Sequence, residues 1–479
     1  MMNTFLWHDY ETWGINPALD RPCQFAAVRT DENFNAIGEP IVLFSRPAPD
    51  LLPHPEAAIV TGLSPRQVRQ EGLSEAEFAR QIRDEMMRPK TCSLGYNTLR
   101  FDDEVTRYAL YRNYYDPYER EYKNGNSRWD IIDMARLTYA LRPQGIEWPL
   151  VDGRPSFRLE NLSAANGLAH GAAHDALSDV QATIQLAALI RDRHPRLFAY
   201  VNEHRDKHSL ASMIDIRNRR PLLHISSKFP AHKGHCGLVV PLAVHPKLRN
   251  AIIVFELSAD PSPLDTLSAE EIHKRVFTAA DDLPEGESRL PLKLVHLNKC
   301  PILANPKLLD DQNAKRLGID KSLCEKHWQS ILGMDLEYKL RSVFDMSDFA
   351  PRQDPEQKLY DGFISEADKR VADEMRHCTV DELGKRHFVF DDSRLNEMQL
   401  RYRARNFPSS LSGNEIQEWR EFVEMRLQNG SDGALSLDEY RDRLRALRTQ
   451  YSDDASKLHV LDELELYGDE IAAEYLKRQ

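Results

Sequence analysis

Two acidic residues stand within the first strand-like segment of the chain. The residues from Phe5 to Thr12 (FLWHDYET) are mostly aromatic or bulky, which favours a buried β-strand. Because side chains alternate along a strand, Asp9 and Glu11 fall on the same face as Trp7. Two residues span about 6.6 Å of strand, so both carboxylates can turn toward one point. Buried acids without a counter-charge are costly, and the pattern therefore indicates a bound cation with oxygen ligands, magnesium or manganese.

Two further acidic points follow later in the sequence. Asp102 opens a helical segment after a strand and turn, and the spacing H-x-x-x-x-D joins His174 to Asp179 at the start of a long helix. Each fragment alone has an ordinary explanation: Asp102 as a helix N-cap, and Asp179 on a surface helix beside a solvated His174. Asp9 and Glu11 could equally stand at a strand end that reaches solvent. Together, however, the three fragments indicate one converging acidic site.

The combined pattern resembles the DEDDh exonucleases, with D-x-E on a first strand, an Asp at a later strand-to-helix turn and H-x-x-x-x-D on a last helix. Five segments are similar to the bacterial exonuclease I family in particular: HDYET at 8–12, LGYN at 94–97, RFDDE at 100–104, NSRWD at 126–130 and YRARNFP at 402–408. The resemblance covers essentially the whole chain, and the five catalytic positions show no departure from the family pattern.

The resemblance implies a fold and a chemistry. It implies an α/β ribonuclease H-like exonuclease domain, with a mixed sheet flanked by helices, then an SH3-like β-barrel domain and an all-α C-terminal domain. Asp9, Glu11, Asp102 and Asp179 would hold two Mg²⁺ ions, which Mn²⁺ can replace, for phosphodiester hydrolysis. His174 would be the general base that takes a proton from the attacking water. The implied reaction removes 5′-mononucleotides from the 3′ end of single-stranded DNA, in DNA repair and recombination.

A tyrosine-rich stretch offers candidates for the substrate path. Between residues 107 and 123 six tyrosines alternate with three arginines, a mixture suited to stacking bases and holding phosphates. They are Tyr108, Tyr111, Tyr114, Tyr115, Tyr118 and Tyr122, with Arg107, Arg112 and Arg120. Tyr108, Tyr111 and Tyr115 also have the helical spacing of core residues, whereas Tyr118 and Tyr122 are expected to face outward.

The resemblance implies substrate contacts in all three domains and one protein partner. The implied substrate-binding residues are Glu11, Arg107, Tyr118, Tyr122, Arg136, Phe157, Arg158, His296, Asn298, Lys299 and Tyr360. The partner is the acidic C-terminal tail of single-stranded DNA-binding protein, for which Arg142 and Tyr200 match family positions on a basic ridge. The family also implies a monomer.

The distribution of charge is uneven along the chain. The formal net charge of -12 argues against indiscriminate binding to nucleic acid, but a confined basic groove remains compatible with it. Residues 193–235 carry nine Lys and Arg against three acids, and six histidines, whereas residues 351–479 carry 28 acids against 20 bases. A basic middle region, a candidate for binding DNA or the protein tail, therefore precedes an acidic C-terminal region.

Composition predicts a cytoplasmic protein of several domains. A chain of 479 residues exceeds what one hydrophobic core usually organises. Six cysteines without a C-x-x-C pair argue against a zinc site and a disulfide framework. We find no run of signal-peptide form and no apolar segment of membrane length, and therefore expect no contact with a membrane.

Periodicity predicts three regions of different secondary structure. In residues 1–194, strands at 23–30, 39–45 and 91–96 alternate with helices at 74–87, 102–113 and 172–193. Short strands at 221–226, 236–244, 250–257 and 290–297 indicate a small antiparallel barrel or sandwich within residues 195–349. Helical segments beginning near 366, 394, 414, 436 and 453 fill residues 350–479. We take these three ranges as the predicted domains.

Two other functions stay open from the sequence. A DEDDh exoribonuclease that trims RNA 3′ ends would have the same catalytic residues, and only the two appended domains favour the DNA enzyme. A non-catalytic single-strand-binding module could use the basic region at 193–235. A pure binder, however, has no need for four converging acids.

Overall fold

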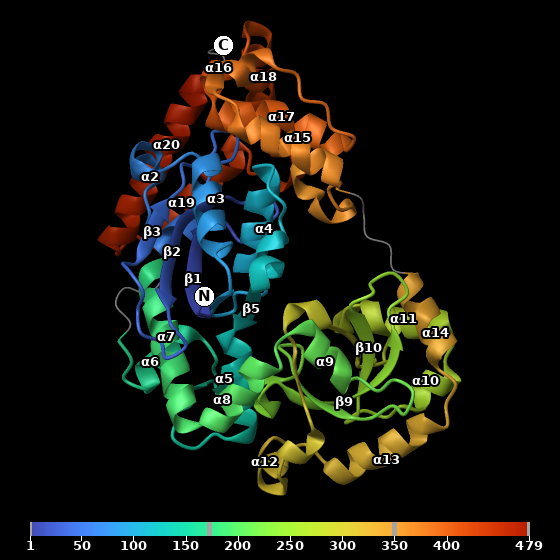
Figure 1. Ribbon diagram of the computed structural model, residues 1–479. Helices are drawn as coiled ribbons and strands as arrows, with labels where there is room; N and C mark the ends of the chain where they lie inside the picture. The colour runs from blue at the N-terminus through green and yellow to red at the C-terminus, as the bar shows by residue number, and fades with distance from the viewer. Residues whose placement is uncertain (1, 170–174, 347–351, 477–479) are drawn as a thin grey trace. The chain divides into compact units, whose positions relative to one another are not determined.

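The chain folds into two compact units. The structure, a computed structural model, describes residues 2–169, 175–346 and 352–476 (Figure 1). Unit 1 comprises residues 1–127, 170–181 and 351–479, and unit 2 comprises residues 128–169 and 182–350. β5 (Ser127–Asp130) and α7 (Ala176–Arg193) run across this division. Within the described ranges, no helix is long and apolar enough to cross a membrane.

The sheet of unit 1 is mixed and is built around the acidic strand. β1 (Thr4–Thr12) pairs antiparallel with β2 (Pro22–Thr30) and parallel with β4 (Thr91–Gly95). β3 (Ile41–Phe44) pairs with the outer side of β2, which gives the order β3-β2-β1-β4. The strand predicted at the start of the chain is confirmed, and it occupies a central position with a hydrogen-bonded neighbour on each side.

Helices α3 (Glu75–Met86) and α4 (Asp102–Arg112) cover one face of this sheet (Figure 1). Leu6 and Tyr10 of β1 share a core with Phe78 of α3 and Val105 of α4. Trp7, on the opposite face, is fully buried as well. β1 therefore has two buried faces, as strands inside α/β domains do. Asp9 and Glu11 lie on the same face as Trp7, opposite to α3 and α4.

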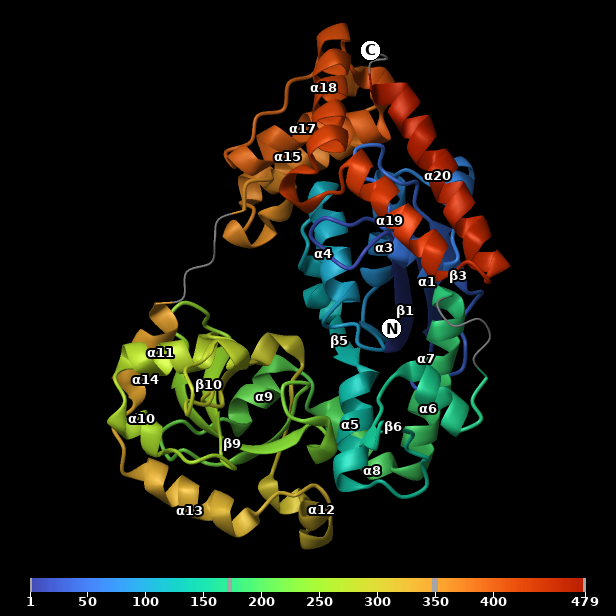
Figure 2. The ribbon, with the colours of Figure 1, turned by 180° about the vertical axis from the view of Figure 1, so that it is seen from behind.

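The C-terminal helices of unit 1 share a core with its N-terminal part. Trp13, Leu52 and Val68 belong to one buried cluster with Trp419 and Tyr440. α20 (Ala455–Tyr475) lies beside α1 (Pro55–Thr61) and α2 (Pro65–Glu71). α2 is labelled next to α20 in Figure 1, and α1 is labelled in the reverse view of Figure 2. The other helices of this part are α15 (Glu366–His377), α16 (Val380–Lys385), α17 (Ser393–Asn406), α18 (Gly413–Asn429) and α19 (Leu437–Gln450).

Unit 2 contains an antiparallel sheet in the order β11-β10-β9-β8-β12. These strands are β8 (Leu222–Ile225), β9 (Cys236–Val244), β10 (Ala251–Glu256), β11 (Leu292–His296) and β12 (Ile302–Ala304), and β6 (Leu150–Val151) pairs with β7 (Arg154–Pro155). The helices are α5 (Ile131–Leu141), α6 (Leu159–Ala165), α8 (Pro195–Glu203), α9 (Lys207–Met213), α10 (Ser262–Thr266), α11 (Ala269–Phe277), α12 (Asp311–Arg316), α13 (Lys321–Leu332) and α14 (Glu337–Asp345).

A buried network of ion pairs joins the N-terminal and C-terminal parts of unit 1. The acids Asp50, Asp354 and Glu356 meet the arginines Arg21, Arg401, Arg405 and Arg426. Arg405 donates to both carboxylate oxygens of Asp50, at 2.8 and 2.6 Å, and to Glu356 at 2.5 Å. Burial alone would raise the pKa of Asp50, but Arg405 and Arg426 hold it below its usual range. Asp50 is therefore charged in the interior and depends on its partners.

Removing one member of this network should destabilise unit 1. We expect Arg405→Met to lower the free energy of unfolding by about 3 to 5 kcal/mol, because Asp50 and Glu356 lose a buried partner. Thermal or urea unfolding measures the loss. Arg445→Met, which removes an exposed arginine paired with Asp442, is the control and should leave the melting temperature unchanged. Equal melting temperatures for the two variants would show that the network adds nothing to stability.

Candidate active site

Three carboxylates of unit 1 converge. Asp9 and Glu11 come from β1 and Asp179 from the first turn of α7, and their ligand oxygens all lie within 4.8 Å of one another. All three side chains are partly buried. The two strand residues point to the same side because they are separated by one residue, as the alternation along β1 requires. The structure therefore brings the D-x-E pair and the acid of H-x-x-x-x-D into one group.

A side chain of β2 positions the start of α7. The Gln24 amide donates to Asp175 Oδ1 at 3.1 Å, and its oxygen accepts from the backbone N–H of Ala176 at 3.3 Å. Asp175 in turn accepts from the N–H of Ser178 through Oδ2 at 3.2 Å. These bonds fix the first turn of the helix against the sheet, next to β1, and so place Asp179 opposite the strand acids. Neither Gln24 nor Asp175 was among the sequence candidates, since contacts between β2 and α7 have no signature in the sequence.

Asp102 lies beside the group through a bond to β1. Its side chain is buried, and Oδ1 accepts from the backbone N–H of Tyr10 at 3.0 Å. The residue is the first of α4, so the N-cap position belongs to Phe101, and the alternative explanation of Asp102 as an N-cap is wrong. Its negative charge contributes to the raised pKa values of both Asp9 and Glu11. The fourth acid therefore adjoins the other three, held by the strand that carries two of them.

The fifth catalytic candidate, His174, lies outside the described residues. The chain is described again from Asp175, which immediately follows it in the sequence. The role of His174 as a general base stays a prediction.

Crowding of like charges makes the site unfavourable for four ionised acids. Burial, and then repulsion by Asp102, Glu11 and Asp179, raises the pKa of Asp9 well above its usual value. Burial and the charges of Asp179 and Asp102 raise the pKa of Glu11 to about 8. Oxygen donors at this spacing suit a hard divalent cation, whose charge would remove the repulsion. The residues present therefore fit a divalent-metal centre.

Two substrate candidates of unit 1, Tyr118 and Tyr360, lie against a third, Arg107. Arg107 is buried and donates to Glu104 at 2.7 Å and to Glu121 at 2.8 Å. The Tyr118 ring lies 5.5 Å from the Arg107 guanidinium carbon, and Tyr360 accepts a bond from Arg107 at 3.2 Å. A phosphate could reach Arg107 only by displacing one of these acids.

The tyrosine-rich stretch divides into core and surface. Tyr122 is 64% exposed, as expected, whereas Tyr118 is partly buried against the core of the C-terminal helices. Tyr108 and Tyr111 are buried, which confirms their core spacing, and Tyr115 is only partly buried.

Two arginines of this stretch are buried in ion pairs with acids of the protein. Arg112 is buried against Glu75 at 2.7 Å, and Arg120 is buried against Asp103 at 2.5 Å. The hypothesis that they hold phosphates is therefore wrong, because each is already neutralised inside the protein.

Unit 2 carries the remaining candidates. Arg136 is buried and donates to Asp133 at 2.6 Å, and its guanidinium lies 5.9 Å from the ring of buried Phe157. The Arg158 side chain is 77% exposed. His296, Asn298 and Lys299 lie at the end of β11, the last two exposed.

The two partner candidates also belong to unit 2. Arg142 follows α5, is partly exposed, and lies 3.8 Å from Asp310. Tyr200 on α8 donates to the backbone oxygen of Leu303 at 3.2 Å.

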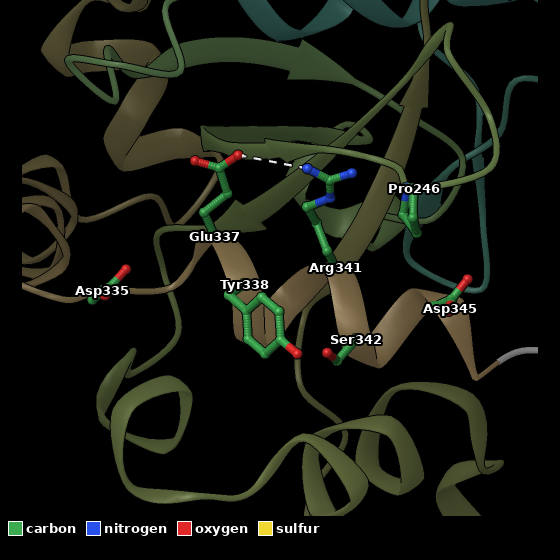
Figure 3. A pocket seen from close by; sticks show the side chains of 7 residues that line it. All are labelled: Pro246, Asp335, Glu337, Tyr338, Arg341, Ser342 and Asp345. Carbon is green, nitrogen blue, oxygen red and sulfur yellow. Dashed lines mark ion pairs between the residues drawn. The ribbon is translucent and has the colours of Figure 1, made fainter.

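A separate open pocket of about 670 Å³ lies at α14 in unit 2 (Figure 3). It is lined by Pro246, Asp335, Glu337, Tyr338, Arg341, Ser342 and Asp345. Arg341 and Glu337 form a long ion pair of 4.0 Å along the helix. None of the candidate site residues that the structure describes lines this pocket, so its size does not bear on the chemistry.

The mixed sheet and its converging carboxylates define a metal-dependent nuclease of the ribonuclease H-like exonuclease class. Residues 6–187 match the family described as Exonuclease, residues 205–346 the Exonuclease I SH3-like domain, and residues 353–471 the Exonuclease I C-terminal domain. Exodeoxyribonuclease I of Escherichia coli K12 is 45% identical over 98% of both chains, and that of Haemophilus influenzae is 43% identical over 97% of this chain and 98% of the other. The chain belongs to the exodeoxyribonuclease I family.

Solved structures agree with this assignment. Exonuclease I from Methylocaldum szegediense is 46% identical, with a TM-score of 0.94 over 98% of this chain and 99% of the other. E. coli exonuclease I in complex with a dA16 oligonucleotide is 44% identical, with a TM-score of 0.95 over 98% and 100%. The family consists of 3′–5′ exonucleases that act on single-stranded DNA, and the chain is such an enzyme. The exoribonuclease and the non-catalytic binding module are not favoured.

The raised pKa of Glu11 predicts a pH dependence of stability without metal. The folded protein keeps a proton on Glu11 up to about pH 8, whereas the unfolded chain releases it near its ordinary value of 4.5. This contribution to stability is therefore present below pH 4.5 and is lost as the pH rises through 8. Unfolding of the EDTA-treated protein should show this loss, and Glu11→Gln should reduce it.

The control variant is Glu418→Gln, an exposed position on α18. It should keep the wild-type pH dependence. Saturating Mg²⁺ should raise the melting temperature of wild type most at high pH, because the cation binds the ionised acids. A pH dependence in Glu11→Gln equal to that of wild type would contradict the crowding of these carboxylates.

Proposed function

We propose that this acidic cluster hydrolyses the last phosphodiester bond at the 3′ end of single-stranded DNA and releases 5′-mononucleotides. The observation that supports the proposal is the convergence of the Asp9, Glu11 and Asp179 oxygens within 4.8 Å. Two Mg²⁺ ions, with Mn²⁺ as a substitute, are the proposed cofactors, held by these residues and Asp102. A structure of E. coli exonuclease I with DNA is described as its zinc-bound form, which supports a divalent-metal site in the family.

Each residue has a proposed part in the reaction. Asp9, Glu11 and Asp179 turn oxygens toward one point, and the Tyr10 N–H fixes the orientation of the Asp102 carboxylate. Bound divalent ions supply the positive charge that activates water and stabilises the leaving oxygen. His174 takes the proton of the attacking water, a role that suits a group with a pKa near about 6.5.

The proposed substrate path uses exposed aromatic and basic side chains. In unit 1, the exposed Tyr122 and Tyr360 and the partly exposed Tyr118 offer ring faces to bases. In unit 2, exposed Arg158 and Lys299 offer charge to phosphates, and His296 and Asn298 adjoin Lys299. Three other candidates are buried: Arg107, Arg136 and Phe157. We propose that they hold neighbouring side chains of the path in place.

A protein partner is proposed for unit 2. One solved structure, 44% identical to this chain, is described as SSB/exonuclease I in complex with an inhibitor. We propose that Arg142 and Tyr200 bind the acidic tail of single-stranded DNA-binding protein, since a partly exposed arginine and an aromatic ring both suit recognition of a carboxylate-ended peptide. A monomer in the cytoplasm, with domains at 1–194, 195–349 and 350–479, completes the proposal.

Loss of one metal ligand should separate cleavage from binding. We expect Asp179→Ala or Asp9→Ala to retain less than a few per cent of wild-type turnover on a single-stranded oligonucleotide, because the ligand set is incomplete. DNA affinity in EDTA should stay close to that of wild type, because the exposed side chains of the path are intact. The control is Asp192→Ala on the same helix, an exposed acid that should keep full activity. Substantial turnover by either ligand variant would remove the residue from the site.

The partner proposal has its own test. A fluorescent peptide with the acidic tail sequence should bind wild type in the micromolar range and more weakly in high salt. Arg142→Ala should weaken binding severalfold or more, whereas Arg420→Ala on the exposed side of α18 should not. Unchanged affinity in Arg142→Ala would exclude Arg142 from the partner site.

A further inference from the structure

A buried ion pair lies next to Asp102, in the first turn of α4. Arg120, in a short 3₁₀ turn at Glu119–Glu121, donates to Asp103 Oδ1 at 2.5 Å, and both side chains are only 1% exposed. Asp103 follows Asp102 in the first turn of α4. Arg120 is therefore paired with the sequence neighbour of a proposed metal ligand.

The first turn of α4 is oriented by bonds from other elements. At its N-cap, Phe101 offers no side-chain acceptor to the helix N–H groups. Instead, Asp102 accepts from the N–H of Tyr10, and Asp103 accepts from Arg120. Thr106, one turn later, donates to the Tyr10 hydroxyl at 3.0 Å. Side-chain bonds thus hold the turn to β1 on one side and to Arg120 on the other.

The ion pair also separates two adjacent acids electrostatically. Asp102 and Asp103 would both be buried anions in the same helical turn, and a buried anion without a partner is strongly unfavourable. Arg120 neutralises Asp103, so Asp102 is left to face Asp9 and Glu11. Loss of Arg120 would remove the 2.5 Å bond that holds Asp103, so the turn could shift and carry Asp102 with it.

The segment of Arg120 also carries two candidate DNA contacts. Tyr118 and Tyr122 stand two residues before and after it, and Glu121 pairs with Arg107 at 2.8 Å. Farther along, Asp116 pairs with Lys369 at 2.8 Å. Arg120 and Glu121 therefore both fasten this segment to α4, Arg120 through Asp103 in the first turn and Glu121 through Arg107 farther along the helix.

We propose that Arg120 is a positioning residue: through Asp103 it holds the Asp102 carboxylate in the cation site and fastens the segment of Tyr118 and Tyr122 to that site. The inference deepens the proposed function and rests on it. According to this inference, Arg120 increases the affinity of the site for the cation and does not contact DNA directly.

The test measures Mn²⁺ binding by calorimetry in the DNA-free full-length protein. Arg120→Met should raise the Kd for Mn²⁺ about tenfold or more, as loss of a residue behind the ligands typically does. The double variant Arg120→Met/Asp103→Asn, which removes both charges of the pair, should recover most of that affinity. If Arg120→Met does not fold, Asp103→Asn alone breaks the same pair and should also weaken binding.

Arg112→Met is the matched control. Arg112 lies in the last turn of the same helix, in a buried pair with Glu75, and so it reports the effect of losing a buried arginine on α4. It should lower the melting temperature while leaving the Kd for Mn²⁺ within about twofold of wild type, because the lost pair is not behind the ligands. Equal losses of Mn²⁺ affinity in Arg112→Met and Arg120→Met, or wild-type affinity in Arg120→Met, would overturn the proposal.

Failure of the underlying function gives a different result. Asp9→Asn should abolish Mn²⁺ binding, because it removes a proposed ligand. If Asp9→Asn bound Mn²⁺ with wild-type affinity, the proposed cation site would be wrong. The proposed role of Arg120 would then fail together with the proposed function.

Discussion

Mutual repulsion among Asp9, Glu11, Asp102 and Asp179 is the constraint on which the rest of the structure depends. A folded protein gains nothing from crowding acids, and the raised pKa values of Asp9 and Glu11 show that the arrangement is unfavourable without a cation. The fold nevertheless fixes each member. β1 sets the spacing of two of them, the Tyr10 N–H holds the third, and α7 carries the fourth. Repulsion among the acids lowers the stability of the metal-free protein. A bound divalent ion removes this repulsion, and the site gains affinity for such ions as a result.

The interactions that stabilise unit 1 lie outside the acidic cluster. The core shared by Trp13 and Trp419 and the buried network around Asp50 and Arg405 join residues far apart in the sequence. Because the C-terminal helices complete this core, they are part of the support of the nuclease sheet. A rigid support matters for a site whose ligands repel one another, since a loose one would relax by moving them apart.

The sequence predicted features that depend on local geometry. The D-x-E pair converges because strand alternation is a property of consecutive residues, and the core tyrosines follow helical spacing. Many strands and helices were located to within a residue or two, whereas β12, with three residues, is too short to show a period.

Features that depend on contacts between distant segments were missed. Arg112 and Arg120 resemble phosphate-binding residues in sequence, but their burial depends on acids supplied by other elements. Gln24 and Asp175 orient α7 through a contact that no spacing rule describes. Burial of Arg107 behind Glu104 and Glu121 could not be predicted for the same reason.

Cleavage polarity and metal dependence, measured together, test most directly whether the acidic cluster degrades single strands from the 3′ end. The substrates are one DNA oligonucleotide labelled at its 3′ end, the same strand labelled at its 5′ end, and matched RNA. After removal of metal with EDTA and addition of Mg²⁺, the 3′ label should leave at once as a mononucleotide, while the 5′-labelled strand shortens progressively. The EDTA-treated protein and the RNA substrate should show little release. Release of the 5′ label first, cleavage without a divalent ion, or a preference for RNA would contradict the account.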